Sequence, residues 1–363
     1  MTSKLSQDLI KSKNWLIDGA NGSEIIKYTD APTADFGAMT TITCPDAVRK
    51  VHESYLEAGA NFIITNTYSV NYNVLGSESV NQKNKCEKLI VDAVKLAREA
   101  IKNCGNKNTF ILGSISEHSP YSKKSEGKTY TIPDWPKSPL EEIENFEKTL
   151  EILIKQDIDG VIVELLSTEE HGTRLLKCVN KVLKSSSKKL PVFLGLVPEF
   201  KNDEKLAKAE GRSLELIKSE KNPDIRFKNP PAFFLNRDFK EFDFNSENIL
   251  KFVNCVADVE IAAIMLKHCD FDVVLPAAKI LKTVWDGPIG TYPQTGFWRH
   301  PEWITEDPDY DLIRIQLRSW LKEGLSMFGG CCGTTPELIK FYKKELNIIS
   351  KERENKIENR MQA

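Results

Sequence analysis

Short apolar runs alternate with longer amphipathic stretches along most of the 363-residue chain. Most of these runs are continuously apolar and lack the two-residue alternation of a half-exposed strand. That pattern is typical of parallel sheets that are covered on both faces. We predict eight strands, at residues 14–19, 61–68, 109–116, 159–166, 191–198, 252–255, 286–293 and 325–330.

Helical patterns fill the intervals between the predicted strands. In residues 44–59 the apolar positions from Val48 to Leu56 fall close to one helical face, and Gly59 is a typical helix stop. Residues 141–156 follow the same pattern. Strand–helix alternation repeated eight times predicts a (β/α)8 TIM barrel with long loops at its C-terminal face. A doubly wound sheet remains the alternative, because repetition alone does not prove closure.

The pattern predicts one barrel domain over residues 1–345, followed by a charged C-terminal tail at 346–363. Two long polar segments, 117–139 and 199–249, do not fit the strands and helices of a minimal barrel. Both follow strand ends, which is the side where barrels build their active sites. Long loops in compact domains are usually functional or disordered, and a peripheral insertion is the alternative for much of 199–249.

Composition narrows the function classes. The formal net charge is -2, which gives no electrostatic reason to expect a nucleic acid or an anionic membrane as partner. No apolar run reaches the length of a signal-peptide core or of a membrane span. We therefore expect a cytoplasmic protein that binds small molecules, and an oligomer is possible.

The chain has 8 cysteines, which in a reducing compartment are expected to be free thiols or metal ligands. Two are adjacent, Cys331 and Cys332, in the glycine-rich stretch FGGCCGTTPE after the last predicted strand. This stretch could cradle a phosphate, form only a turn, or direct two thiolates at one metal ion. The third interpretation accounts best for the paired thiols, since glycine permits the backbone bend that both sulfurs require.

A catalytic zinc site uses three protein ligands and one open position. Cys255 is predicted to end the sixth strand, so in a barrel it would face the same mouth as Cys331 and Cys332. A purely structural zinc in a non-catalytic barrel is the alternative. Such a site needs a fourth protein ligand, and His268 or Cys269 is the nearest alternative in the sequence.

Six motifs in the correct order resemble one enzyme family, the zinc-dependent homocysteine S-methyltransferases. GGCCGTTPE and the Asn-Cys pair at 254–255 are similar to the specific signatures of that family. The other four are LIDGANGSEI, TNTYSVN, DGVIVELLSTEE and YPQTG, which begin at residues 16, 65, 159 and 292. The resemblance implies a (β/α)8 barrel, Zn2+ bound by Cys255, Cys331 and Cys332, and conversion of homocysteine to methionine.

The resemblance also implies a substrate pocket. Asp18 and Glu164 are expected to hold the substrate ammonium, although an Asx turn and a helix-start carboxylate are their alternative roles. Further expected contacts are Gly19, Ala20, Tyr68 and Asn254, the last as a residue that orients Cys255. Tyr292 and Trp298 offer aromatic faces to a cationic methyl donor.

The methyl donor is expected to be S-methylmethionine or S-adenosylmethionine. Departures from the family pattern gather on the substrate and donor side, for example Leu165 in place of a hydroxyl residue and Trp298 where an acidic residue is common. A betaine-dependent enzyme, and a methyltransferase for another thiol or a selenol, therefore remain alternatives.

Overall fold

The computed structural model describes residues 14–29, 37–75, 80–106, 108–117, 138–198, 244–299 and 302–362, together with Leu5, Gln7 and Leu9. The predicted long segments 117–139 and 199–249 lie almost entirely outside the described residues, so their role stays a prediction.

Eight parallel strands form a closed barrel. Neighbouring strands pair in the order β1-β10-β7-β6-β5-β4-β3-β2. A bridge between Ile17 and Phe62 joins β1 to β2 and closes the sheet. The predicted TIM barrel is therefore confirmed. The strands are β1 Trp15–Leu16, β2 Phe62–Ile64, β3 Phe110–Ser116, β4 Gly160–Leu166, β5 Val192–Leu196, β6 Ile261–Lys267, β7 Ile289–Tyr292 and β10 Met327–Phe328.

Seven of the eight predicted strands contain an observed barrel strand, and the sixth prediction is wrong. Residues 252–255 form the last turn of helix α12, Ser246–Cys255, and the sixth strand is the next apolar run, Ile261–Lys267. The Asn245 side chain caps α12 by accepting a hydrogen bond from the backbone N–H of Asn248, 2.9 Å away. Ile249 and Phe252 then bury one face of the helix.

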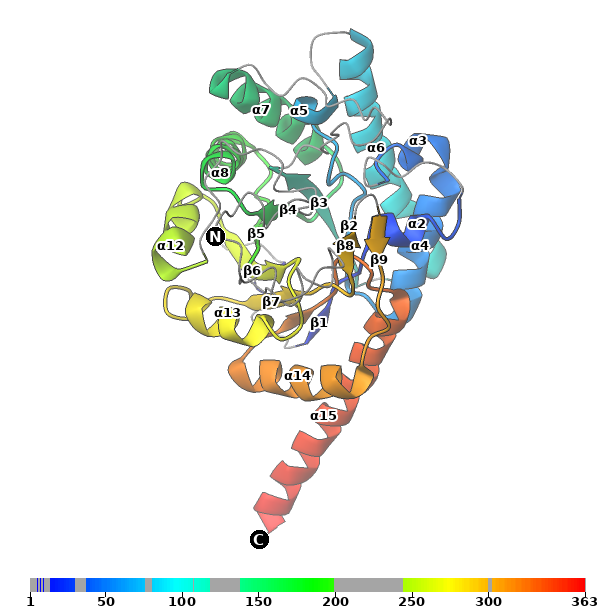
Figure 1. Cartoon of the computed structure of the whole chain (residues 1–363), viewed down its shortest axis with the longest axis vertical. Coiled ribbons are helices and arrows are strands. Elements are labelled where there is room, and N and C mark those ends of the chain that lie inside the picture. Colours follow the sequence, from blue (N-terminus) through cyan, green and yellow to red (C-terminus); the bar gives the residue numbers. More distant parts are fainter. Residues whose placement is uncertain are drawn as a thin grey trace, which may run out of the picture.

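Helices surround the strands, and Figure 1 shows them as an outer ring. Helix α4 ends at Gly59, as predicted. Helix α15 runs past the barrel as a single projecting rod, and the predicted tail forms its second half (Figure 1). Besides α12, the helices within the described part of the chain are α2 Asn21–Ile25, α3 Thr40–Thr43, α4 Pro45–Ala58, α5 Tyr72–Leu75, α6 Val80–Cys104, α7 Pro139–Lys155, α8 Glu169–Ser185, α13 Val274–Leu281, α14 Tyr310–Glu323 and α15 Pro336–Gln362. A small hairpin of β8 Phe297–Arg299 and β9 Glu302–Ile304 follows β7.

Two buried layers hold the barrel together. The larger lies between the strands and the helices, and the smaller fills the barrel interior. Phe62 is central to the interior, with its ring 5.6 Å from that of Trp15 and 5.9 Å from that of Phe193. Because side chains alternate along a strand, inward positions near the strand ends form a top layer of the interior. In this protein the top layer is polar, and it forms the floor of the site described below.

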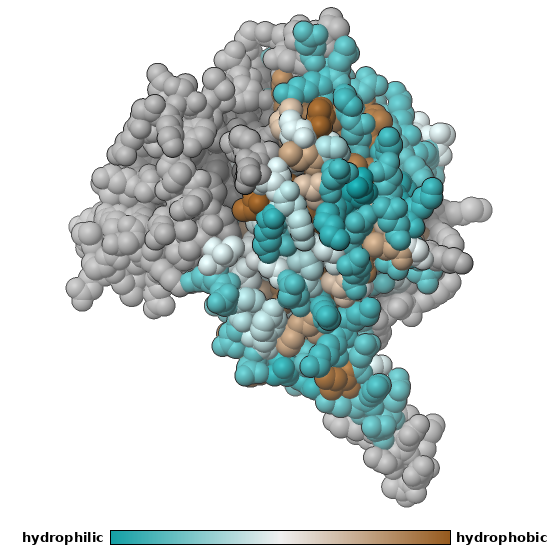
Figure 2. Space-filling view, turned by 90° about the vertical axis from the view of Figure 1, so that its right-hand side faces the viewer, coloured by the Kyte–Doolittle hydropathy of each residue, from teal (hydrophilic) through white to brown (hydrophobic). Residues whose placement is uncertain are grey.

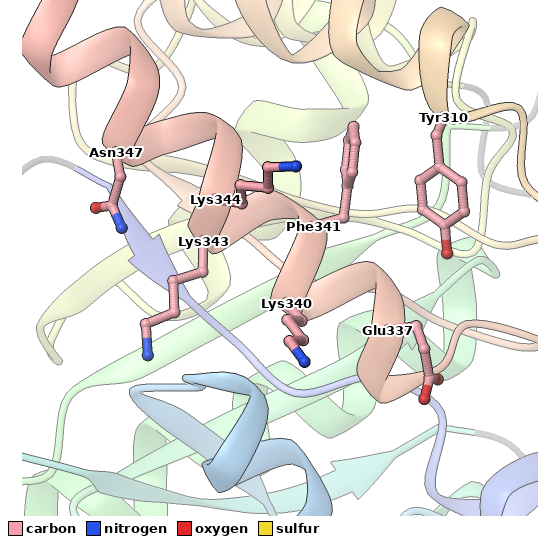
Figure 3. Close-up of a pocket in the computed structure, with 7 residues that line it drawn as sticks. All are labelled: Tyr310, Glu337, Lys340, Phe341, Lys343, Lys344 and Asn347. Atoms are coloured by element: carbon pink, nitrogen blue, oxygen red, sulfur yellow. The ribbon is translucent and has the colours of Figure 1, made fainter.

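The outer surface is mostly hydrophilic where Figure 2 displays it, with isolated hydrophobic residues. Among the described helices, none has the length and apolar character needed to cross a membrane. A pocket lies along the outside of α15, lined by Tyr310 and by α15 residues including Lys340 and Phe341 (Figure 3). It is separate from the side chains that gather at the strand ends.

Candidate active site

Polar side chains gather where the parallel strands end. Asp18 follows β1, Glu164 lies near the end of β4, and Tyr292 ends β7. His268 directly follows β6, and Cys331 and Cys332 follow β10. In a (β/α)8 barrel these carboxyl ends share one face, so residues far apart in sequence meet there.

The paired thiols and His268 form one cluster. The sulfurs of Cys331 and Cys332 lie 3.9 Å apart. Nδ1 of His268 lies 3.6 Å from the Cys331 sulfur and 3.7 Å from the Cys332 sulfur. Within the described residues, these three are the group of His, Cys and acidic side chains whose ligand atoms all fall within 4.8 Å of one another.

The backbone of the thiol loop is fixed from several sides. The Cys331 N–H donates to the carbonyl of Pro293 (2.6 Å), and the Thr295 N–H donates to the carbonyl of Cys332 (2.9 Å). Gly333 has a φ of 74°, in the left-handed region that favours glycine. A Cβ on Gly329 would lie 2.6 Å from the Tyr292 ring. The glycines therefore permit a turn and a close approach that other residues would disturb.

His268 reaches the thiols through an unusual backbone conformation. Its φ is 52°, in a region that non-glycine residues rarely adopt. The His268 N–H donates to the carbonyl of Tyr292, 3.1 Å away, which continues the pairing of β6 with β7. Left-handed residues of this kind concentrate at functional sites. The neighbouring Cys269 is 4% exposed and packs in the outer hydrophobic layer, away from the thiol pair.

The two thiols differ in acidity. The hydrogen bond with Cys332 and the adjacent His268 hold the pKa of Cys331 well below its usual range. The same thiol–thiol contact, together with burial, raises the pKa of Cys332. One thiolate is therefore stabilised readily, and a positive charge between the sulfurs would stabilise the second.

The cluster fits a metal ion of the zinc type. With bonds of about 2.3 Å to sulfur and about 2.0 Å to nitrogen, a tetrahedral ion separates two sulfurs by about 3.8 Å and a sulfur from a nitrogen by about 3.5 Å. The observed separations are 3.9, 3.6 and 3.7 Å. Soft thiolates with an imidazole are also a donor set that suits zinc.

Cys255 lies elsewhere, which contradicts its expected ligand role. It ends α12, before β6 begins, so it is at the amino end of a seven-residue strand whose carboxyl end carries His268. Such a strand spans on the order of 20 Å. Cys255 packs beside Thr173 and Lys177 of α8, where burial raises the pKa of its thiol. Asn254 is exposed on α12 and cannot orient a ligand at the strand ends.

Asp18 is held in the floor of the site. It is fully buried, and its Oδ2 accepts a hydrogen bond from the N–H of Ile64, 2.8 Å away. The Tyr292 hydroxyl donates to Asp18 Oδ1 (2.8 Å) and also lies 3.0 Å from the carbonyl oxygen of Gly19. Burial raises the pKa of Asp18 to about 8, against the lowering effect of these hydrogen bonds.

Glu164 forms a second part of the floor and is already paired. Its Oε1 accepts from the Ser114 hydroxyl, and its Oε2 accepts from the ammonium of Lys267. Nζ of Lys267 also lies 3.9 Å from the centre of the Tyr292 ring. Beside Glu164, Leu165 has a φ of 53°, and the pairing of β4 with β5 shifts register there. Lys267 was not among the predicted site residues, because the apolar run of β6 conceals an inward-facing cation at its end.

Of the other residues predicted to contact the substrates, Tyr68 faces the thiol cluster, whereas Gly19 and Ala20 are already in contact with other side chains. Tyr68 is half-buried, and its pKa is raised by burial and then by Glu164 and the two cysteines, so it faces the cluster. A Cβ on Gly19 would lie 2.6 Å from the Tyr55 hydroxyl, and the Ala20 N–H already donates to Thr334. Trp298 lies on β8, and its contact with a donor stays a prediction.

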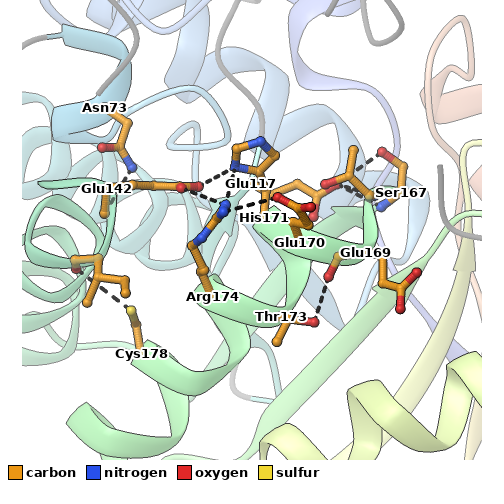
Figure 4. A network of polar contacts seen from close by, with 12 residues as sticks. Asn73, Glu117, Glu142, Ser167, Glu169, Glu170, His171, Thr173, Arg174 and Cys178 are labelled. Atoms are coloured by element: carbon orange, nitrogen blue, oxygen red, sulfur yellow. Dashed lines mark hydrogen bonds and ion pairs between the residues drawn. The ribbon is translucent and has the colours of Figure 1, made fainter. Parts of the chain in front are cut away.

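Glu117 at the end of β3 fixes the turn that follows β4 (Figure 4). Its Oε1 accepts from the backbone N–H groups of Ser167 (2.8 Å) and Thr168 (2.7 Å). Burial raises the pKa of Glu117 to about 8. Beside it, Nδ1 of His171 lies 2.5 Å from Glu142 Oε1, which ties α8 to α7. This network supports the strand end that carries Glu164.

Comparison with known proteins agrees with the fold. A sequence model described as homocysteine S-methyltransferase matches residues 15–346. The chain belongs to the homocysteine S-methyltransferase family.

Two curated relatives match this family member over nearly their whole lengths. Homocysteine S-methyltransferase 2 of Zea mays is 24% identical over 360 residues, which cover 92% of this chain and 89% of the relative. Homocysteine S-methyltransferase 2 of Arabidopsis thaliana is 22% identical, with 91% and 92% covered. The solved metallated form of the homocysteine methyltransferase MmuM from Escherichia coli has the same fold, with a TM-score of 0.62 at 17% identity, over 94% of this chain and 99% of that one.

Proposed function

We propose that this protein transfers a methyl group from a cationic sulfonium donor to the thiol of homocysteine, and that His268, Cys331 and Cys332 hold a zinc ion beside the thiol. The observation that carries the proposal is the separation of the three donor atoms, 3.6 to 3.9 Å, which suits a shared tetrahedral ion. Membership of the homocysteine S-methyltransferase family supports the reaction class.

Methylation of a thiol needs a thiolate, and a free thiol with a pKa of about 8.5 is mostly protonated at neutral pH. Bound at this cluster, a zinc ion supplies charge that stabilises the deprotonated thiol of the substrate. In the transfer, a new sulfur–carbon bond forms to the methyl group while the bond from that carbon to the donor sulfur breaks. The bonding pair stays with the donor, which leaves as a neutral thioether and needs no proton.

The side chains of this protein chiefly position the reactants. Asp18 is a buried carboxylic acid that a substrate ammonium would favour in its charged form. Tyr292 fixes Asp18 from β7, and Tyr68 closes the side of the pocket next to the thiols. The apolar barrel interior beneath them excludes water, which strengthens each electrostatic contact.

Histidine as the third donor changes the charge of the site. The sequence predicted three cysteines, whereas a neutral imidazole and two thiolates carry one negative charge fewer. If these residues held a zinc ion, the substrate thiolate beside it would be correspondingly less electron-rich, and we infer that a strongly activated methyl donor would be required. Positively charged sulfonium donors, S-methylmethionine or S-adenosylmethionine, meet that requirement.

A panel assay tests the proposal. Zinc-loaded protein is mixed with homocysteine and with S-methylmethionine, S-adenosylmethionine or betaine in separate reactions, and methionine is measured by mass spectrometry. We expect methionine with at least one sulfonium donor and none from the Cys331→Ser protein with the same donor. Absence of methionine with every donor would overturn the homocysteine assignment. Equal activity of Cys331→Ser would overturn the role of the thiol pair.

A further inference from the structure

Lys267 places a buried cation at the end of β6, at the residue before His268. It ends β6, and its side chain is fully buried, with 0% exposed. Its ammonium pairs with Oε2 of Glu164 on β4 and lies 3.9 Å from the ring centre of Tyr292 on β7. The lysine thus contacts a carboxylate and an aromatic face at once.

The path of this side chain is built into the neighbouring strand. β5 lies between β4 and β6, so Lys267 must cross β5 to reach Glu164. It crosses at Gly195, where an added Cβ would lie 2.8 Å from Cδ of Lys267 and 2.9 Å from the carbonyl oxygen of Val163. A residue with any side chain at position 195 would obstruct the ion pair. The glycine and the lysine therefore form one arrangement.

A buried carboxylate beside an aromatic face is a good site for a primary ammonium. Homocysteine carries such a group, and the family resemblance implied that Asp18 and Glu164 hold it. In this protein Lys267 provides that ammonium from within the chain, and its charge cancels that of Glu164. Asp18, the other carboxyl group of the floor, is fully buried and already accepts hydrogen bonds from Ile64 and Tyr292.

We propose that Lys267 is a specificity-determining residue that takes the ammonium position of the pocket. Given the methyl transfer to a thiol proposed above, the acceptor class then becomes thiols that carry a carboxylate, with or without an α-amino group. The α-amino group of homocysteine contributes little to recognition, because its strongest site is already filled.

The test compares homocysteine with 4-mercaptobutanoate, which is the same molecule without the amino group. The measured quantity is the ratio of kcat/KM for the two thiols, with one sulfonium donor held constant. For the wild-type enzyme we expect the two kcat/KM values to agree within about tenfold. The reason is that Lys267, and not the substrate amino group, makes the ammonium contact with Glu164. Lys267→Met frees Glu164 for the substrate ammonium, so the ratio should rise at least fivefold in favour of homocysteine.

Glu164→Gln provides a second, independent readout if Lys267→Met does not fold. With Lys267 in the ammonium position, Glu164→Gln leaves the ratio within threefold of wild type, whatever its effect on the overall rate. If Glu164 instead binds the substrate ammonium, the variant loses its preference for homocysteine. Thermal unfolding of each variant identifies loss of folding separately from loss of preference.

The outcomes separate the two proposals. A wild-type ratio above tenfold, a ratio unchanged by Lys267→Met, or a preference lost in Glu164→Gln overturns the role of Lys267 and leaves homocysteine methylation intact. Methylation of neither thiol with any donor overturns the proposed function, and the inference about Lys267 falls with it.

Discussion

Nδ1 of His268 lies 3.6 Å from the sulfur of Cys331, although 63 residues separate them in the chain. Two features produce this contact. Parallel strands β6 and β10 deliver their carboxyl ends to the same face of the barrel, with β7 between them. A φ of 52° then turns the His268 side chain toward the thiols while Cys269 turns into the outer layer. The left-handed conformation thus brings the imidazole, and not the Cys269 thiol, next to the thiol pair.

This selection gives the first prediction, on metal binding. We expect His268→Ala to lower zinc affinity by at least about 100-fold, since loss of a mere outer-shell partner already costs about 10–100-fold. Cys269→Ser is the matched control and should retain wild-type affinity, because Cys269 lies outside the donor cluster. Competition with a chromogenic zinc chelator measures both. Weakened binding in Cys269→Ser together with intact binding in His268→Ala would reverse the assignment of the third ligand.

Sequence reasoning predicted the barrel because its strands are short, continuously apolar and regularly spaced. It failed at the sixth strand, where the four-residue run 252–255 was chosen over the seven-residue run 261–267. Length was the available signal, since strands most often have five or six residues and the longer run fits that length better. That single choice moved the predicted third ligand to the wrong end of the strand.

Within the site, the thiol pair could be predicted because the two cysteines are adjacent in sequence. The role of His268 was not, since it depends on a left-handed turn that no local pattern encodes. Lys267 was hidden for a different reason. Its charge is compensated by Glu164, 103 residues earlier, and the space for it comes from a glycine on a third strand. Such pairings exist only once the sheet has closed.

A second prediction concerns the pH dependence of stability. Asp18 has a pKa of about 8 in the folded protein, raised by burial from 3.8. Between these values the folded state keeps a proton that the unfolded chain has lost, so stability is fully present below about pH 4 and declines as pH rises toward 8. Asp18→Asn cannot lose this proton. Relative to that variant, the wild type should lose up to about 1.4 kcal/mol per pH unit.

Urea unfolding of both proteins at pH 5.5, 6.5 and 7.5, without thiol substrate, measures this difference. Asparagine keeps an oxygen for the N–H of Ile64, so the variant is a close isostere of protonated Asp18. Curves that run parallel across this range, or a wild type that gains stability relative to Asp18→Asn as pH rises, would contradict the prediction.

The third prediction concerns the support of the β4 end. Glu117→Ala leaves the N–H groups of Ser167 and Thr168 without their shared acceptor, which should cost about 1–3 kcal/mol in the free energy of unfolding. Glu117→Gln keeps an acceptor oxygen and should cost less than half as much. Chemical denaturation of the two variants tests the order. If glutamine and alanine destabilise equally, the acceptor role of Glu117 is refuted.

The last prediction separates two cysteines that the sequence placed in one site. Cys255→Ser should retain one zinc per chain and wild-type methylation, because Cys255 lies on α12 before β6, while the donor cluster follows the far end of that strand. Its thiol is half-buried at the edge of the outer hydrophobic layer, so the cost in stability should stay within about 1 kcal/mol. Cys331→Ser, measured in parallel by metal analysis and methionine formation, should lose both properties. Zinc loss from a folded Cys255→Ser protein would restore the three-cysteine site and exclude the histidine centre.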